Sequence, residues 1–129
     1  MYNGSIINPS PTIIAPAGEA ITSGPFSAVA FNNNGSFVTA KKGSVPVGIL
    51  IAEEEDVIAI GDEITAQIKD ISAWKAGAAV STGALLTPDN EGLAIAATAG
   101  DFIFAIALES ADTKGQVIKV QITKSGYAK

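Results

Sequence analysis

The chain has 129 residues and carries 13 acidic side chains against eight lysines and no arginine, which gives a formal net charge of −5. The lysines are scattered, so the concentrated basic face that duplex binding requires is missing and no nucleic-acid partner is expected. The absence of cysteine and histidine excludes disulfides, thiol nucleophiles, an imidazole base and the usual zinc sites. The most apolar stretch, residues 93–108, is interrupted by Gly100 and Asp101 and is too short to cross a bilayer, so no membrane partner is expected.

The composition favours a single all-β domain. Apolar residues make up 47% of the chain and are mostly Ala, Ile and Val, while Gly and Pro recur throughout. Ile and Val suit a half-buried pleated surface, and Gly and Pro mark frequent turns. We therefore expect a small barrel or sandwich of short strands.

Residues 1–16 differ from the rest and are predicted to form an extended N-terminal arm, which leaves residues 17–129 as the β domain. Prolines at positions 9, 11 and 16 keep the backbone extended and remove hydrogen-bond donors. Two interpretations stay open: a tail with an edge strand at residues 12–15, or an arm that docks on another surface. The candidate contact residues of the arm are its four isoleucines, Ile6, Ile7, Ile13 and Ile14.

An internal duplication follows, with copies at about residues 18–68 and 77–122. Glycines and apolar runs recur in the same order: segment 18–24 matches 77–83, 33–35 matches 90–92, 45–51 matches 102–108, and 61–68 matches 115–122. Ordered matches with small deletions in presumed turns are typical of a duplicated supersecondary unit. We expect two related β units packed into one core.

Each copy is predicted to contain four strands. They are expected at residues 26–31, 36–40, 45–52 and 63–69 in the first copy and at 84–87, 93–97, 102–109 and 116–124 in the second. Asn34-Gly35 and residues 89–92 are hairpin signals, because Gly and Asn tolerate positive φ. Between the copies, residues 70–76 are predicted to form one helical turn in which Trp74 is a plug of the core or of an interface.

The run Phe102–Leu108 is apolar without alternation, which indicates burial on both faces, by the core and by a partner. Phe102 and Phe104 are therefore candidate interface residues, together with Trp74. The expected assembly is a homo-oligomer, a trimer ahead of a dimer.

No catalytic, metal or cofactor site is visible, and the protein is not expected to be an enzyme. The acidic clusters are residues 53–56 and the pair Asp62-Glu63. Neighbours in a strand point to opposite faces, and the run 53–56 lacks the alternating ligands of a calcium loop, so a solvated loop is favoured over a weak cation site. Without histidine a serine triad is impossible, and the glycines fit no phosphate-binding pattern.

The second copy resembles the repeating pattern of small capsid decoration, or cement, proteins of tailed phages. The resemblance rests on Gly77-Ala-Ala-Val-Ser-Thr-Gly-Ala-Leu-Leu-Thr87, on segments 92–98 and 103–109, and on Gly115-Gln-Val-Ile-Lys-Val-Gln-Ile122. It implies a β-rich protein without catalytic residues or cofactors, which joins its own copies, often as trimers, on the major capsid protein. The resemblance also implies a place on the capsid exterior of the virion, after assembly in the host cytoplasm.

Other classes of function are weighed beside this one. A head-fibre base or a tail-tube subunit would polymerise head to tail rather than close into a small oligomer. A carbohydrate-binding module would use Tyr2, Trp74 and Tyr127 as platforms. An enzyme using Asp62 or Glu63 is the least supported, because no polarising partner is visible.

Overall fold

The structure, a computed structural model, describes residues 11–51 and 58–129. Within these ranges it contains ten β-strands and no helix. The strands are β1 Thr12–Pro16, β2 Ala28–Phe31, β3 Phe37–Thr39, β4 Gly48–Leu50, β5 Glu63–Gln67, β6 Asp70–Lys75, β7 Leu85–Pro88, β8 Ala94–Ala96, β9 Phe102–Ala107 and β10 Val117–Tyr127.

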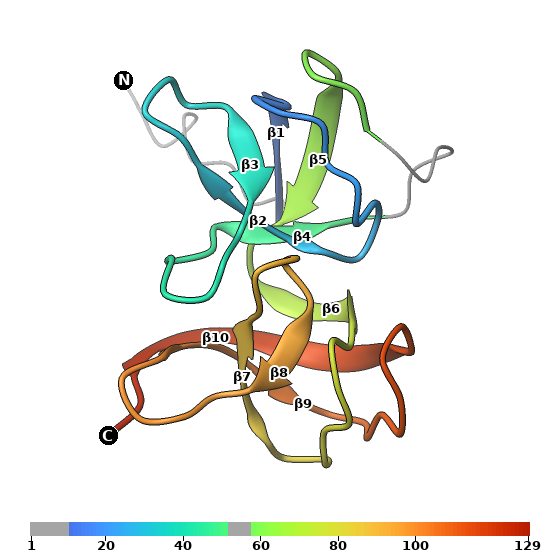
Figure 1. Ribbon diagram of the computed structural model, residues 1–129, viewed down its shortest axis with the longest axis vertical. Helices are drawn as coiled ribbons and strands as arrows, with labels where there is room; N and C mark the ends of the chain where they lie inside the picture. The colour runs from blue at the N-terminus through green and yellow to red at the C-terminus, as the bar shows by residue number, and fades with distance from the viewer. Residues whose placement is uncertain (1–10, 52–57) are drawn as a thin grey trace, which may run out of the picture.

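These strands form two five-stranded antiparallel sheets, one above the other in Figure 1. The strand orders are β1-β5-β4-β2-β3 and β6-β10-β9-β7-β8. Each sheet curls so that a single parallel bridge joins its two edges, Ala17 to Phe37 in the first and Ala76 to Ala94 in the second. Neither sheet closes into a barrel, and the all-β, sandwich-like alternative is confirmed.

The two sheets are structural repeats, because adding five to each strand number converts the first order into the second. Equivalent backbone hydrogen bonds have equal lengths: Leu50 N to Ser27 O and Ala107 N to Ala84 O at 2.9 Å, and Gly18 N to Phe37 O and Gly77 N to Ala94 O at 2.7 Å. The duplication read from the glycines and apolar runs is therefore present in the fold. We call residues 12–67 the first repeat and residues 70–127 the second.

The helical turn predicted for residues 70–76 is wrong, because Asp70–Lys75 form strand β6. This strand pairs along its length with β10, from Asp70 opposite Ile122 to Lys75 opposite Val117. It is the counterpart of β1, which pairs with β5 in the same way. Each repeat thus has five strands rather than the four predicted.

The N-terminal segment contributes to the first sheet. Strand β1 is the edge strand beside β5, and its Ala15 is buried in the core. Of the two interpretations, the edge strand applies to residues 12–16, which belong to the β domain rather than to an arm. Residues 1–10, with Ile6 and Ile7, lie outside the described residues.

Two other sequence predictions are corrected in the first repeat. The long strand predicted at 45–52 is only Gly48–Leu50 in the described residues, and Pro46 just before it has no N–H to donate. Gly83 corresponds to Phe26 rather than to Gly24, because the N–H groups of Phe26 and Gly83 donate to the equivalent carbonyls of Leu50 and Ala107. The turn before β2 is therefore two residues longer than its counterpart before β7.

The buried apolar residues form two clusters. The first lies inside the first repeat and includes Ile21, Phe37 and Leu50. The second fills the second repeat around Trp74 and Phe104 and extends to four residues of the first repeat, Ala28, Ala30, Ala40 and Ile49. One face of the first sheet thus packs on its own core, and its other face packs on the second repeat.

Candidate interaction surfaces

The carbonyl group of Gly92, in the β7–β8 hairpin, is one of the groups that join the two repeats. The carbonyl oxygen of Gly92 accepts hydrogen bonds from Ala28 N at 2.8 Å and from Trp74 Nε1 at 2.9 Å. Gly92 has φ +76°, and a Cβ there would lie 2.8 Å from Ala28 O. Only glycine fits this backbone conformation and this close approach without strain.

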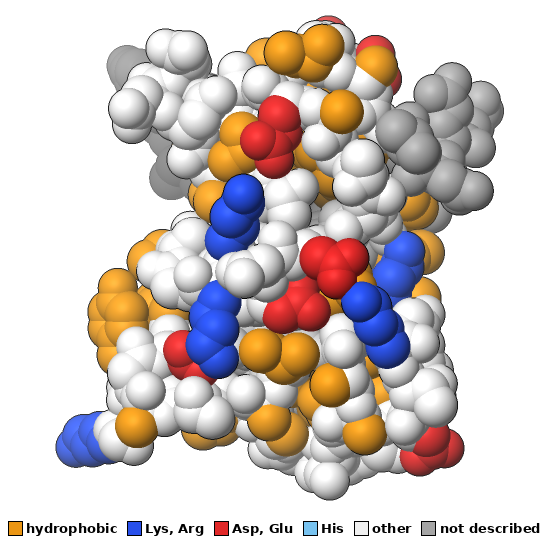
Figure 2. All heavy atoms as spheres, in the orientation of Figure 1, with side chains coloured by type: hydrophobic (Ala, Val, Ile, Leu, Met, Phe, Trp, Pro, Cys, Tyr) orange, Lys and Arg blue, Asp and Glu red, His pale blue; other side chains and the backbone are white. Residues whose placement is uncertain are grey.

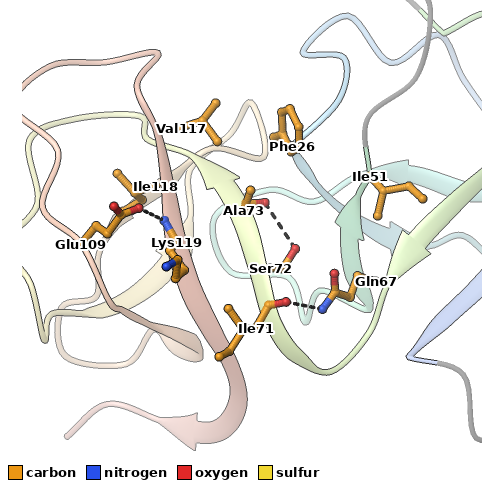
Figure 3. Close-up of a pocket in the computed structure, with 10 residues that line it drawn as sticks. All are labelled: Phe26, Ile51, Gln67, Ile71, Ser72, Ala73, Glu109, Val117, Ile118 and Lys119. Atoms are coloured by element: carbon orange, nitrogen blue, oxygen red, sulfur yellow. Dashed lines mark hydrogen bonds between the residues drawn. The ribbon is translucent and has the colours of Figure 1, made fainter.

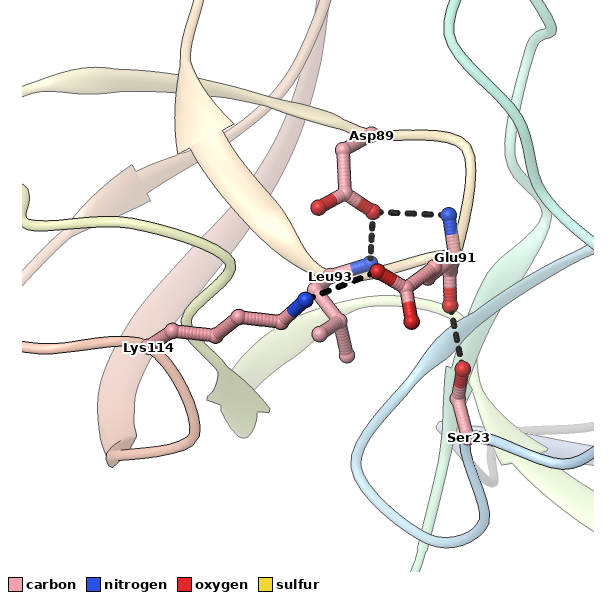
Figure 4. A network of polar contacts seen from close by, with 5 residues as sticks. All are labelled: Ser23, Asp89, Glu91, Leu93 and Lys114. Carbon is pink, nitrogen blue, oxygen red and sulfur yellow. Dashed lines mark hydrogen bonds and ion pairs between the residues drawn. The ribbon is translucent and has the colours of Figure 1, made fainter.

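The same hairpin carries a polar network, shown in Figure 4. One carboxylate oxygen of Asp89 accepts the N–H groups of Glu91 at 2.8 Å and Leu93 at 3.0 Å, which fixes the turn. Ser23, in the longer turn of the first repeat, donates its hydroxyl to Glu91 O at 2.6 Å. Lys114 donates to the Glu91 carboxylate at 2.8 Å, and this hydrogen bond raises the pKa of Lys114.

Charged side chains gather around the junction of the repeats in Figure 2. The carboxylate of Asp101 accepts the N–H of Thr98 at 2.8 Å and the hydroxyl of Thr98 at 2.9 Å. Lys42 of the first repeat lies 3.6 Å from the same oxygen. The hydrogen bonds from Thr98, with a smaller contribution from Lys42, hold the pKa of Asp101 below its ordinary value of 3.8.

Replacement of Asp101 by Asn is expected to lower the melting temperature at neutral pH. A carboxyl group whose pKa is depressed in the folded state stabilises the fold above its unfolded pKa, and this contribution is lost as the pH falls through the folded pKa. The difference between wild type and Asp101→Asn should therefore shrink below about pH 4. Thermal unfolding followed by circular dichroism at several pH values measures it. Asp112→Asn, at an exposed position, is the control, and a difference independent of pH would contradict the prediction.

A groove of about 460 Å³ lies between the repeats (Figure 3). Phe26, Ile51 and Gln67 line it from the first repeat, and Ile71 and Val117 are among the lining residues from the second. Its polar groups are partly engaged, because Gln67 Nε2 donates to Ile71 O at 2.6 Å. The charged residues in its lining are Glu109 and Lys119, and the Glu109 carboxylate accepts the N–H of Lys119 at 2.7 Å.

The sequence-predicted aromatic contact residues lie mostly inside the protein. Trp74 and Phe104 are fully buried and meet edge to face, with ring centroids 5.4 Å apart. Phe102 is half-buried and packs against Tyr127, also at 5.4 Å. Trp74 therefore contributes to the junction between repeats and offers no platform to a sugar, whereas Tyr127 is exposed.

The two described isoleucines of the N-terminal segment differ in burial. Ile13 is half-buried and packs against the first core, while Ile14 is 65% exposed on the edge strand. Strand β9, predicted to be covered partly by another molecule, is mostly buried within its own chain, with Phe102 and Ile106 half-buried. Side chains on both faces of β9 are apolar because other parts of the same chain cover most of each face.

The surface nevertheless exposes apolar side chains from both repeats. They are Ile14, Phe31, Val45, Ile60, Ile71, Leu85, Leu108, Val117 and Tyr127. Scattered exposed residues of this kind are common, so position decides which of them matter.

The acidic residues assemble no reaction centre in the part of the chain that the structure describes. Asp62 accepts the N–H of Ala59 at 3.0 Å and so stabilises a turn, and Glu63 is exposed at the start of β5. Residues 53–56 lie outside the described ranges. Residues 11–51 and 58–129 contain no group of three or more potential metal ligands. They also form no helix long and apolar enough to cross a membrane.

The geometry defines an all-β protein of two tandem five-stranded repeats, joined by a hairpin. This fold is similar to that of the N base of head fibre gp8.5 from bacteriophage phi29, with a TM-score of 0.67 and 18% sequence identity. The similarity covers 92% of this chain and 98% of that one. No family model and no curated protein matches the sequence. At this identity the comparison establishes a shared fold.

Proposed function

We propose that the protein is a structural component of a tailed-phage head that binds the outer surface of the capsid. The observation that carries the proposal is the likeness of almost the whole chain to almost the whole of a head-fibre base. The cement-like pattern of the second repeat supports the same location. The major capsid protein is the proposed partner, and the host cytoplasm is where assembly would occur.

Two roles fit this location, a fibre base and a decoration protein, and the fold similarity favours the fibre base. A fibre base anchors further structure to the head, which agrees with the extent of the fold similarity. A decoration protein stabilises the shell, because a ligand that binds only the assembled state shifts the equilibrium towards it. Both roles require binding energy without chemistry, and both gain from several copies acting together. A homo-oligomer remains part of the proposal: a trimer ahead of a dimer for the decoration role, and a head-to-tail polymer for the fibre base.

The test is co-sedimentation of the purified protein with expanded capsids that lack surface proteins. We expect saturable binding that is blocked by prior occupation with the same protein. A temperature ramp on the loaded capsids then separates the two roles. A raised disruption temperature favours decoration, and an unchanged one favours a fibre base. Failure to co-sediment at saturating concentration would contradict capsid binding.

A further inference from the structure

The internal junction is formed by an apolar face of the first repeat and a hairpin of the second. The equivalent face of the second repeat and the equivalent hairpin of the first repeat are not covered in the same way. In the first repeat, the apolar face formed by Ala28, Ala40 and Ile49 is completely buried by the second repeat. The corresponding residues of the second repeat are Leu85, Ala97 and Ile106. Leu85 is 44% exposed, and the other two are only half-buried. The apolar face of the first repeat is therefore buried within the chain, whereas the equivalent face of the second repeat is partly exposed.

The hairpin that covers this face also occurs twice. Gly92, at the tip of the β7–β8 hairpin, is buried against Ala28, whereas Gly35 at the tip of the β2–β3 hairpin is exposed. The backbone is the same at both, with φ +76° and +78°, but only Gly92 has atoms within 4 Å of an added Cβ. In the described residues, the β7–β8 hairpin thus packs on the apolar face of the first repeat. The equivalent β2–β3 hairpin and the equivalent face of the second repeat do not make this contact within the chain.

We propose that the β2–β3 hairpin of one molecule docks on the β7–β9 face of a second copy of this chain. The contact would repeat the internal junction: Gly35 O would accept Leu85 N as Gly92 O accepts Ala28 N at 2.8 Å. Asn33 corresponds to Asn90, whose side chain accepts Lys42 N at 3.2 Å, and Ala99 supplies the equivalent N–H. The N–H groups of Leu85 and Ala99 are backbone donors. They are therefore present even though the side chains differ from those of Ala28 and Lys42 in the first repeat.

Small side chains lie close to the place where the hairpin would dock. Ala96 and Ala84, the chain neighbour of Leu85, are among the residues that line a hollow in the surface. Ala96 corresponds to Thr39, whose methyl group would be 3.2 Å from a Cβ on Gly92. The smaller side chain leaves more room at the corresponding place.

The contact between copies is weaker than the internal one. Trp74 Nε1 binds Gly92 O from the repeat that carries the hairpin, and its counterpart beside the β2–β3 hairpin is Ala15, which has no side-chain donor. The turn that supplies the Ser23 hydroxyl is two residues shorter in the second repeat. The ion pair of Lys42 with Asp101 is replaced by Ala99 and Ser44, so both partners change together and no charge is left unpaired. A hairpin on one repeat and a face on the other make the contact head to tail, so it joins successive copies into a ring or a filament.

This inference rests on the homo-oligomer within the proposed function and names its surface. It is tested on the free protein, so that its failure is distinguishable from a failure to bind capsids. Leu85→Glu is expected to weaken self-association by about tenfold or more in sedimentation equilibrium, because it would bury an unpaired carboxylate. Ile60→Glu, at a 70% exposed position in the first repeat, should change nothing. Equal effects of the two substitutions would overturn the proposal, as would a monomer at every concentration.

Cysteine cross-linking tests the direction of the contact, since the chain has no cysteine of its own. Asn34→Cys and Ala99→Cys are both at exposed positions, and circular dichroism checks that each variant folds. A short thiol cross-linker should join the two variants when they are mixed and should leave each variant alone uncoupled. Ile60→Cys replaces Ala99→Cys in the control mixture. Coupling of Asn34→Cys to itself, or equal coupling in the control, would overturn the head-to-tail contact.

Discussion

Gly92→Ala is expected to destabilise the protein by roughly 3 kcal/mol, while Gly35→Ala costs only about 1 kcal/mol. Gly35 and Gly92 have φ +78° and +76°, so the backbone strain of an added methyl group is the same at the two sites. At Gly92 the new Cβ would also lie 2.8 Å from Ala28 O and 3.3 Å from Ala28 N. Relief of these contacts would lengthen the hydrogen bond from Ala28 N to Gly92 O, which joins the repeats.

Urea unfolding of the two variants measures this difference, and Trp74 provides a second readout. Trp74 is the only tryptophan, is fully buried, and donates its indole N–H to Gly92 O. Opening of the junction should shift its fluorescence emission to the red in Gly92→Ala and not in Gly35→Ala. Equal losses of stability in the two variants, with unchanged emission, would show that the junction tolerates the methyl group.

Gly35 and Gly92 also show which features of the fold can be predicted from the sequence and which cannot. Asn33-Asn34-Gly35 and Asn90-Glu91-Gly92 identify two equivalent hairpins, because glycine at these turns reflects a local backbone requirement. The strand content and the duplication follow from such local signals. The burial of one tip and the exposure of the other depend on a contact between repeats, which no local pattern encodes. The sequence therefore identifies Gly92 as a turn glycine but does not show that it forms the contact between the repeats.

The missed strand β6 has a different cause. Asp70, Ala73 and Lys75 of this strand are residue types depleted in strands, and its partner β10 is distant in sequence. A signal was present in the duplication itself. Ala15-Pro16-Ala17-Gly18 and Trp74-Lys75-Ala76-Gly77 continue the same spacing upstream of the matched segments. Extending the repeat by one strand assigns β6 as the counterpart of the edge strand already considered at residues 12–15.

Large apolar side chains are candidates for contact residues, but their size and hydrophobicity also favour burial in the core. Trp74 and Phe104 have the largest apolar surfaces to bury, and the chain buries them itself. Ile14 and Leu85, which remain exposed, resemble the buried isoleucines and leucines in every local respect. Their exposure follows from an edge position and from the open face of the second repeat.

Trp74→Ala is expected to cause the largest loss of stability of any single substitution considered, about 3–5 kcal/mol. The indole packs against Phe104 within the cluster that also contains Ala28 and Ile49 of the first repeat, so its removal leaves a cavity where the two repeats meet. Trp74→Phe keeps an aromatic ring there but removes the donor to Gly92 O, and should cost about 1–3 kcal/mol. Ile71→Ala, on the same strand but 57% exposed, should cost little.

Differential scanning calorimetry of the three variants distinguishes a joint core from two independent ones. Because the Trp74 cluster spans both repeats, Trp74→Phe should lower the melting temperature in a single transition that includes the first repeat. A second transition at the wild-type temperature would mean that the first repeat, with its own cluster around Phe37 and Leu50, unfolds independently. In that case Gly92 would join two autonomous sheets, and Gly92→Ala would separate them without melting either one.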